Sequence, residues 1–389
     1  MWKLSTTPWP KPLLPHPYSR PALQVPFPAH CLPSIPSARL LLAMRRSHLL
    51  FAAITTPVAL LSVLALSFLA PSLTPVFATP ASGPSPSHSP TPATVHHVFF
   101  AYVANFNDHT ITPINLESGF ALDPIYVGAG PTSLALSPDG STLYVVNVTS
   151  ATLSIVATAL HRTTSTLRLP STPYAIAITP DGSRAYITSP TTLSLQVVDL
   201  STPQVLPSIA LPYAPYAIAL TPDGLNAYVT DISNSAVTPV NLVDSKALPA
   251  IPVGVGPTAI AITQDGLTAY VINSASNSLS PINLTTGKAM PAIPSGPSPY
   301  ALALSPDGLN AYVTSYLDRT LTPIDLVTAK AQTPIQVGIA PESIALVPNA
   351  SMAYVSNYGS HTITPIDLAT AKAQPPIPVG SGPLQIVIG

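Results

Sequence analysis

The sequence predicts an all-β fold, a seven-bladed β-propeller with four antiparallel strands in each blade. Three observations predict it: a repeat of 42 residues, a period-two alternation of side chains within each repeat, and the absence of helical periodicity. Four strands in each repeat would form one blade, and seven blades would close a ring. The tyrosines that mark the repeat are Tyr102, Tyr144, Tyr186, Tyr228, Tyr270, Tyr312 and Tyr354. The prolines in the same phase are Pro131, Pro173, Pro215, Pro257, Pro299, Pro341 and Pro383.

Each repeat contains four short strands joined by tight turns. In one repeat the expected strands span residues 216–221, 226–231, 236–242 and 246–253, with a Pro-Asp-Gly turn after the first. In such a turn the aspartate accepts a backbone hydrogen bond and the glycine adopts a positive φ. We therefore expect the phased aspartates to be structural and not a calcium-binding ring. They are Asp139, Asp181, Asp223, Asp265 and Asp307, with Asn349 in the sixth position.

The first strand of each repeat alternates large and small side chains. Ile260 and Ile262 alternate with Ala259 and Ala261, and successive side chains point to opposite faces of a strand. Neighbouring sheets approach most closely near the axis of a ring, where two facing isoleucines would overpack. We therefore expect an alanine of one blade to face a large side chain of the next.

The fourth strand of each repeat is expected at the rim of the ring. It is rich in proline, as at Pro249 and Pro252, Pro291 and Pro294, and Pro376 and Pro378. Proline removes the backbone donors through which an exposed edge would recruit another sheet.

The two ends of the repeat region predict how the ring closes. The first repeat begins at its second strand, and the chain finishes with an inner strand that has nothing after it. We expect residues 383–389 to complete the blade of residues 98–127. Closure of this kind leaves no loose edge, and we expect a monomer.

The residues before the repeats form three segments. We expect residues 1–43 to be a disordered proline-rich extension, and both Met1 and Met44 are candidates for the natural start. Residues 44–78 have the layout of an export signal: two arginines, an apolar stretch and small residues near Ala78. The alternative is an uncleaved anchor, the one way in which the protein would meet a membrane. Residues 79–97 form a Pro/Ser/Thr-rich linker to the propeller of residues 98–389.

Composition excludes several classes of protein. Eight basic and 15 acidic residues follow residue 98, a net charge of −7. Because binding to a phosphate backbone needs clustered lysine and arginine, we expect no nucleic-acid partner. A single cysteine, Cys31, excludes an internal disulfide framework and a thiolate metal cage.

The repeats resemble those of a known family. AYVTD at 227–231, AYVIN at 269–273, AYVTS at 311–315 and AYVSN at 353–357 are similar to the repeat of the YVTN family of β-propellers. The resemblance covers about residues 98–389 and implies an exported or surface-associated protein. The second and third repeats depart from it, because the second lacks the Pro-Ile-Asp/Asn segment and Pro190 ends the second strand of the third. These departures leave the geometry of their outer strands open.

Candidate ligand-binding residues directly follow the phased prolines. Since these prolines begin the inner strands, the next side chains should stand at the mouth of the central channel. Tyrosine, threonine and glutamate there could hold a polar or aromatic ligand, although the tyrosines could equally cap the core between blades. The candidates are Thr132, Tyr174, Tyr216, Thr258, Tyr300 and Glu342, with Leu384 in the seventh position and Tyr213 nearby.

His109 and His361 occupy equivalent positions, six repeats apart, and would lie on adjacent blades of a closed ring. Two imidazoles could bind a metal if a third ligand were close, and Asp108 is adjacent in sequence. The other repeats carry unrelated residues there, as a solvated turn would. We therefore predict no metal site, with these two histidines as the candidates if one exists.

Motifs for catalysis or a cofactor are absent from the sequence. It contains no HExxH, GxSxG, GxxxxGK[ST] or CxxC motif, and no pair of acid and base residues can be named. We expect a secreted or cell-surface protein that binds a protein, a glycan or a cell-envelope component without a cofactor. The alternatives are an enzyme with its site in the central channel, such as a lactonase, a lyase or a dehydrogenase subunit, and a structural module of the cell surface.

Overall fold

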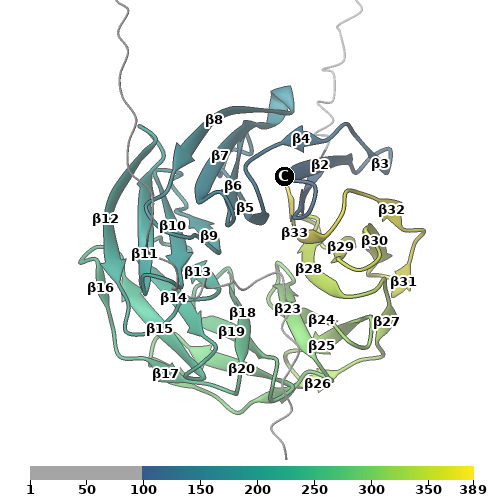
Figure 1. Cartoon of the computed structure of the whole chain (residues 1–389). Coiled ribbons are helices and arrows are strands. Elements are labelled where there is room, and N and C mark those ends of the chain that lie inside the picture. Colours follow the sequence, from purple (N-terminus) through teal and green to yellow (C-terminus); the bar gives the residue numbers. More distant parts are fainter. Residues whose placement is uncertain (1–98) are drawn as a thin grey trace, which may run out of the picture. The chain divides into compact units, whose positions relative to one another are not determined.

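The computed structural model describes residues 99–389, which form seven sheets arranged around one axis (Figure 1). The predicted segments 1–43 and 44–78 lie outside the described residues, as does the linker 79–97. The single helix among the described residues is the 3-10 turn Thr158–Leu160, and none of these residues forms a helix able to cross a bilayer.

The blades are numbered in chain order, and their strands run from the axis outward (Figure 1). Blade 1 contains β33 (Pro383–Ile388), β1 (Phe100–Asn105), β2 (Thr110–Asn115), β3 (Phe120–Ala121) and β4 (Ile125–Tyr126). Blade 2 contains β5 (Pro131–Leu136), β6 (Thr142–Asn147), β7 (Thr152–Ala157) and β8 (Arg162–Arg168). Blade 3 contains β9 (Ile176–Ile178), β10 (Arg184–Ser189), β11 (Ser194–Asp199) and β12 (Gln204–Ala210).

The remaining four blades share one pattern. Blade 4 contains β13 (Ile218–Leu220), β14 (Asn226–Asp231), β15 (Ala236–Asn241), β16 (Lys246–Ala247) and β17 (Ile251–Pro252). Blade 5 contains β18 (Pro257–Ile262), β19 (Thr268–Asn273), β20 (Ser278–Asn283), β21 (Lys288–Ala289) and β22 (Ile293–Pro294). Blade 6 contains β23 (Pro299–Leu304), β24 (Asn310–Ser315), β25 (Thr320–Asp325), β26 (Lys330–Ala331) and β27 (Ile335–Gln336). Blade 7 contains β28 (Pro341–Leu346), β29 (Met352–Asn357), β30 (Thr362–Asp367), β31 (Lys372–Ala373) and β32 (Ile377–Pro378).

The ring closes as the sequence predicts. β33 pairs antiparallel with β1, so that Tyr102 faces Val387 and Val103 faces Ile386. The backbone amides of Phe100 and Gly389 each donate to the carbonyl of the other, at 2.9 and 3.0 Å. The last strand of the chain is therefore the inner strand of the first blade.

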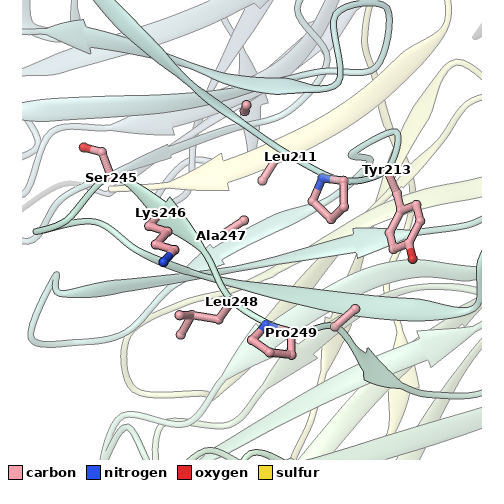
Figure 2. A pocket seen from close by; sticks show the side chains of 10 residues that line it. Leu211, Tyr213, Ser245, Lys246, Ala247, Leu248 and Pro249 are labelled. Atoms are coloured by element: carbon pink, nitrogen blue, oxygen red, sulfur yellow. The ribbon is translucent and has the colours of Figure 1, made fainter.

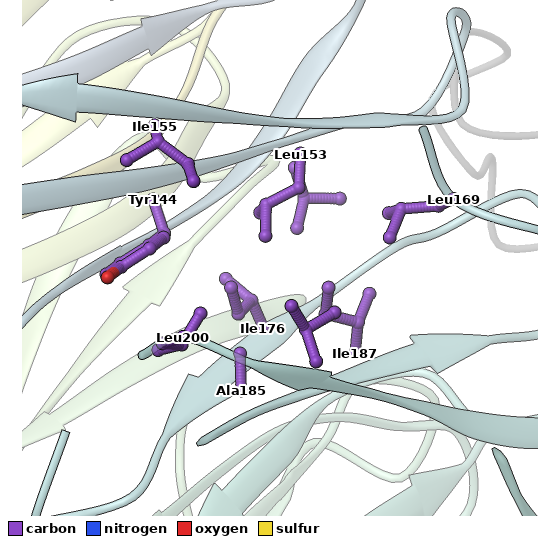
Figure 3. Close-up of a cluster of buried hydrophobic side chains, with 10 residues drawn as sticks. Tyr144, Leu153, Ile155, Leu169, Ile176, Ala185, Ile187 and Leu200 are labelled. Atoms are coloured by element: carbon purple, nitrogen blue, oxygen red, sulfur yellow. The ribbon is translucent and has the colours of Figure 1, made fainter. Parts of the chain in front are cut away.

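The alternation of large and small side chains also packs as predicted. Ala303 of β23 belongs to the same apolar cluster as Ile344 and Leu346 of β28, in the next blade. The same arrangement joins blades 2 and 3, where Ala135 packs with Ile176 and Ile178. Figure 3 shows this second cluster, in which side chains from both blades meet around Ile176. At these interfaces an alanine of one blade thus lies against a large side chain of the next, whereas between blades 1 and 2 Val387 takes the position of the alanine.

The outermost strand differs from the prediction in five blades, where it is divided into two strands of two residues each. The cause lies in the third strand. The carbonyl of Pro239 in β15 accepts a hydrogen bond from the Leu248 amide, so this residue faces the outer strand. Because proline has no N–H, the ladder cannot continue at this point. Pro113, Pro281, Pro323 and Pro365 occupy the equivalent positions in the other blades with a divided outer strand.

Blades 2 and 3 have continuous outer strands, β8 and β12, each of seven residues. Their third strands carry Ile155 and Val197 at the position of the proline, and both residues pair with a residue of the outer strand. The departures of these two repeats from the family pattern therefore change the rim and leave the ring intact.

The Pro-Asp-Gly turns are structural, as predicted. The carboxylate of Asp181 accepts the amide of Ser183 at 3.0 Å and the hydroxyl of Thr179 at 2.5 Å, and Gly182 has φ of +71°. These hydrogen bonds lower the pKa of Asp181 to about 2, with that from Thr179 contributing most. The other four phased aspartates accept the amide two residues later in the same way.

In four blades, a buried asparagine at the end of the second strand forms hydrogen bonds to the third strand of the same blade. The amide of Asn273 donates to the hydroxyls of Ser278 and Ser280, at 3.1 and 2.9 Å. A Cβ at Gly254 would lie 2.6 Å from Cγ of Asn273, so no larger residue fits beside the asparagine. Blade 3 has Ser189 in place of the asparagine and Pro170 in place of the glycine. The smaller serine there accompanies the larger proline.

Removal of residues 383–389 tests the closure. Because Leu384 and Ile386 are buried and core truncations cost about 2–5 kcal/mol each, we expect the free energy of unfolding to fall by more than about 4 kcal/mol. A synthetic peptide with the sequence of residues 383–389 should raise the melting temperature of the truncated protein in a concentration-dependent way, and a scrambled peptide should not. A truncated protein that melts like the full chain would show that closure does not hold the ring.

Candidate functional site

Four of the predicted ligand residues, and Leu384 in the seventh equivalent position, are the second residues of their inner strands. They are Thr132 of β5, Thr258 of β18, Tyr300 of β23, Glu342 of β28 and Leu384 of β33. In blades 3 and 4 the inner strand begins later, and Tyr174 and Tyr216 lie two residues before it. All seven positions therefore lie at or just before the start of the inner strands that surround the axis.

The structure brings together four of these residues from four blades, and we call them the tyrosine cluster: Tyr174, Tyr216, Tyr300 and Glu342. The hydroxyl of Tyr174 donates to that of Tyr216 at 2.5 Å, and the Tyr216 and Tyr300 hydroxyls are 3.2 Å apart. The rings of Tyr174 and Tyr216 are tilted at 36° to each other, with their centroids 4.5 Å apart. Because blade 5 separates Tyr216 from Tyr300, their contact passes across the centre of the ring.

The hydrogen bonds of the cluster run in one direction. A tyrosine hydroxyl has one proton to donate. When Glu342 is ionised its carboxylate can only accept, so Tyr300 donates to it and Tyr216 in turn donates to Tyr300. Since Tyr174 donates to Tyr216, the three protons all point along the chain toward Glu342.

Glu342 lies at the end of this chain and is 5% exposed. Burial raises the pKa of its carboxyl group to about 8, and the hydrogen bond from Tyr300 opposes that rise only partly. Its Oε1 is buried and has no hydrogen-bond partner among the described residues. An unpaired buried carboxyl is costly to keep, and such groups occur preferentially at functional sites.

Thr132 and Thr258 form hydrogen bonds within the protein. The hydroxyl of Thr132 donates to the carbonyl of Tyr174, and that of Thr258 donates to the carbonyl of Tyr300, both at 3.0 Å. Each bond crosses from one blade to the next. The threonines therefore hold the backbone of the tyrosines in place, and their donors are used within the protein. Leu384 is buried and contributes no polar group to the cluster.

Tyr213 lies apart from the tyrosine cluster. Its side chain is 40% exposed and lines a groove of about 730 Å³ toward the rim, between the end of β12 and the outer strand of blade 4. Figure 2 shows Tyr213 on one side of this groove with Leu248 and Pro249 opposite. The loop that carries both Tyr213 and Tyr216 thus directs them to different places.

His109 and His361 occupy equivalent turns, as predicted. Both have positive φ, 58° and 56°, and in both the Nδ1 atom accepts the amide of a glycine 21 residues later, Gly130 or Gly382, at 3.1 Å. Asn277 serves the same purpose in blade 5, where its side chain accepts the amide of Ser298. Within residues 99–389, no three His, Cys, Asp or Glu side chains come together as a potential metal site.

Tyr316 is a residue of the site that the sequence analysis missed. Its ring is half-buried and lies 5.8 Å from that of Tyr300, at an angle of 43°. It directly follows the AYVTS segment of blade 6, and the same repeat position holds Phe106 in blade 1 and Tyr358 in blade 7. A comparison of the repeats position by position would have shown this second aromatic position.

The comparisons with known proteins agree with the fold. A family model described as a YNCE-like beta-propeller matches residues 239–352. No curated protein sequence matches the chain. Together with the seven closed sheets, the family match identifies a β-propeller repeat protein.

Solved structures of similar shape include proteins of different functions. The hydrazine synthase of Kuenenia stuttgartiensis is 21% identical with a TM-score of 0.64, covering 69% of this chain and 92% of its own. A functionally unknown protein from Desulfotomaculum acetoxidans is 18% identical with a TM-score of 0.67, covering 74% and 98%. A proposed 6-phosphogluconolactonase of Bacteroides fragilis is 18% identical with a TM-score of 0.63, covering 77% and 100%. At these identities the likeness shows the shared fold alone.

The raised pKa of Glu342 predicts how stability depends on pH. Between the ordinary pKa of 4.5 and the folded value of about 8, the folded protein holds a proton that the unfolded chain has lost. The free energy of unfolding should therefore fall as pH rises through this window, by up to about 1.4 kcal/mol per pH unit from this group. Glu342→Gln should remove this contribution, because glutamine resembles the protonated acid.

The measurement is urea unfolding of both proteins from pH 5 to pH 9. The difference between the two curves isolates Glu342, since the aspartates with lowered pKa values titrate below this range. We expect Glu342→Gln to be the more stable protein at pH 9. Curves that stay parallel across the range would show that Glu342 is ionised at neutral pH.

Proposed function

We propose that this β-propeller binds a ligand at the tyrosine cluster and does so without catalysis. The observation that carries the proposal is the convergence of Tyr174, Tyr216 and Tyr300 from three blades on the buried carboxyl of Glu342. Tyrosine offers an apolar ring and a polar hydroxyl on one rigid side chain, a combination common at recognition sites.

The alternative, that the tyrosines only cap the core, accounts for the rings but not for the glutamate. The tyrosine rings are half-buried, so their hydroxyls could have remained in water without a charged partner. A carboxyl with a buried, unpartnered oxygen adds nothing to packing and destabilises the folded state at neutral and alkaline pH. Its presence at the end of the hydroxyl chain favours recognition.

An enzyme remains the second candidate because a carboxyl with a pKa near 8 can act as a general acid or base at neutral pH. Glu342 would be that group. Acid–base catalysis commonly divides the work between two groups of different pKa, and the cluster supplies one that titrates near neutrality. The arrangement therefore supports binding better than turnover.

The resemblance of the repeats to the YVTN family and the layout of residues 44–78 support an exported protein, either secreted or held at the cell surface. Its partner would be a protein, a glycan or a component of the cell envelope. A net charge of −7 after residue 98 argues against a nucleic-acid partner. The ring closes on its own termini, and this supports a monomer.

The binding proposal is tested with the variant Tyr174→Phe/Tyr216→Phe/Tyr300→Phe. It keeps the rings and removes the hydroxyl chain, so its melting temperature should stay within a few degrees of the wild type while attachment to isolated cell envelopes falls by about tenfold or more. Tyr126→Phe, at an exposed rim position, is the control and should attach normally. Undiminished attachment of the triple variant would eliminate the cluster as the site, and no attachment by the wild type would favour a structural role.

The export proposal predicts that the secreted protein begins near Thr79. Sequencing of the N-terminus of material recovered from the culture medium or the cell surface would check this. Material that retains the apolar stretch before Ala78 would indicate an anchor, and accumulation of the chain in the cytoplasm would contradict export.

A further inference from the structure

Glu342 is the one residue with a formal charge on β28 and on the four strands that pack against β28. β28 contacts β23, β24, β29 and β33. The ionisable side chains of these four strands are Tyr300, Tyr312 and Tyr354, and none of the strands contains Asp, His, Lys or Arg. The carboxyl group thus lies among tyrosines with no cation beside it to balance the charge it would carry.

We propose that the tyrosine cluster binds a protonated primary amine, with Glu342 as its anionic partner and the tyrosine rings packed around the ammonium group. This inference rests on the proposed binding function and names the chemical class of the ligand. An amine is the ligand that supplies both things that Glu342 lacks: a positive charge, and an N–H donor for the buried Oε1.

The aromatic rings suit a cation as well. The faces of tyrosine rings attract an ammonium group within about 6 Å, by roughly 0.5–2 kcal/mol depending on solvent exposure. Tyr300, which donates to the carboxyl group, lies in a ring pair with Tyr316, and Tyr174 and Tyr216 form a second pair joined to Tyr300 through its hydroxyl. Tyrosine hydroxyl oxygens can also accept the second and third N–H of a primary ammonium.

Other ligand classes fit the cluster less well. An anion would meet the carboxylate with no arginine or lysine on the packed strands to offset the repulsion. A neutral sugar could stack on the rings, but it would leave Glu342 either protonated or charged without a partner. A quaternary ammonium brings the charge but has no N–H for Oε1. The order of preference is therefore primary ammonium, quaternary ammonium, neutral alcohol and carboxylate.

Binding of an ammonium group should release a proton. At pH 7 the free Glu342 is mostly protonated, whereas its complex with an ammonium group requires the carboxylate. The proton leaves Glu342 for the buffer, and the amine keeps its own. With a pKa of about 8 for Glu342, roughly 0.9 proton is released for each ligand bound at pH 7.

The experiment is titration calorimetry of the full chain with n-butylammonium chloride at pH 7, in phosphate and in Tris buffer. The difference in heat between the buffers gives the number of protons released, expected close to one. Affinity should rise about ninefold from pH 6 to pH 7, as more Glu342 ionises. Tetramethylammonium should bind more weakly, n-butanol more weakly still, and butyrate without measurable heat.

Two variants separate the role of Glu342 from a general loss of structure. Glu342→Gln should abolish the proton release and the pH dependence and weaken butylammonium binding at least tenfold. Tyr300→Phe keeps the ring and removes the hydrogen bond that lowers the pKa of Glu342, so its pH profile should shift to higher pH. Tyr126→Phe should leave all of these measurements unchanged.

The inference is overturned if butylammonium does not bind, if it binds without releasing a proton, or if n-butanol binds as tightly as butylammonium does. It is also overturned if Glu342→Gln binds as the wild type does. These results are distinct from a failure of the proposed function. Tyrosine-dependent attachment to cell envelopes without amine binding would refute the amine alone, whereas attachment independent of the tyrosines would refute the site itself.

Discussion

The structure depends on the complementary volumes of the inner strands where neighbouring blades meet. An alanine on one blade leaves room for an isoleucine or leucine on the next, as with Ala303 against Ile344. Protein interiors are packed as densely as organic crystals, so matched volumes are needed at each interface around the ring, including the one between blades 1 and 2, where Val387 replaces the alanine. The volumes can match at every interface only if the last strand returns to the first blade, because an open ring would leave one large face and one small face without partners. Volume complementarity and closure are thus one constraint.

This constraint frees certain positions for other uses. The side chain after each phased proline lies outside the part of the inner strand where alanine packs against isoleucine or leucine. It can therefore vary without disturbing the packing between blades. Seven repeats place seven such side chains at equivalent positions around the axis, so differences between repeats bring chemically different side chains together. Tyr174, Tyr216, Tyr300 and Glu342 are far apart in sequence but meet because equivalent positions of a ring converge on its axis. The threonines of the other repeats serve the same site indirectly, by holding the backbone of two tyrosines.

The repeats also show how one substitution is matched by another. Proline in the third strand accompanies a divided outer strand, and Ile155 or Val197 in its place accompanies a continuous one. Where the second strand ends in asparagine, as at Asn273, a glycine lies against it, since any Cβ there would clash. Both pairs follow from local geometry, a missing N–H in the first case and a lack of space in the second.

The sequence by itself determined the number of blades, the order of strands, the closure and the turn chemistry, because each depends on local patterns that recur in the seven repeats with little variation. It also located the ring of candidate residues, since the phased prolines fix where each inner strand begins. Only the tertiary structure decided which candidates meet. The direction of a side chain after a turn depends on contacts between blades. In the structure Tyr213 lies toward the rim, and the hydroxyls of Thr132 and Thr258 donate to carbonyls of the neighbouring blade. The burial of Glu342, and hence its raised pKa, likewise depends on tertiary structure, because β28 packs against strands of both neighbouring blades and Tyr300 of one of them donates to the carboxyl group.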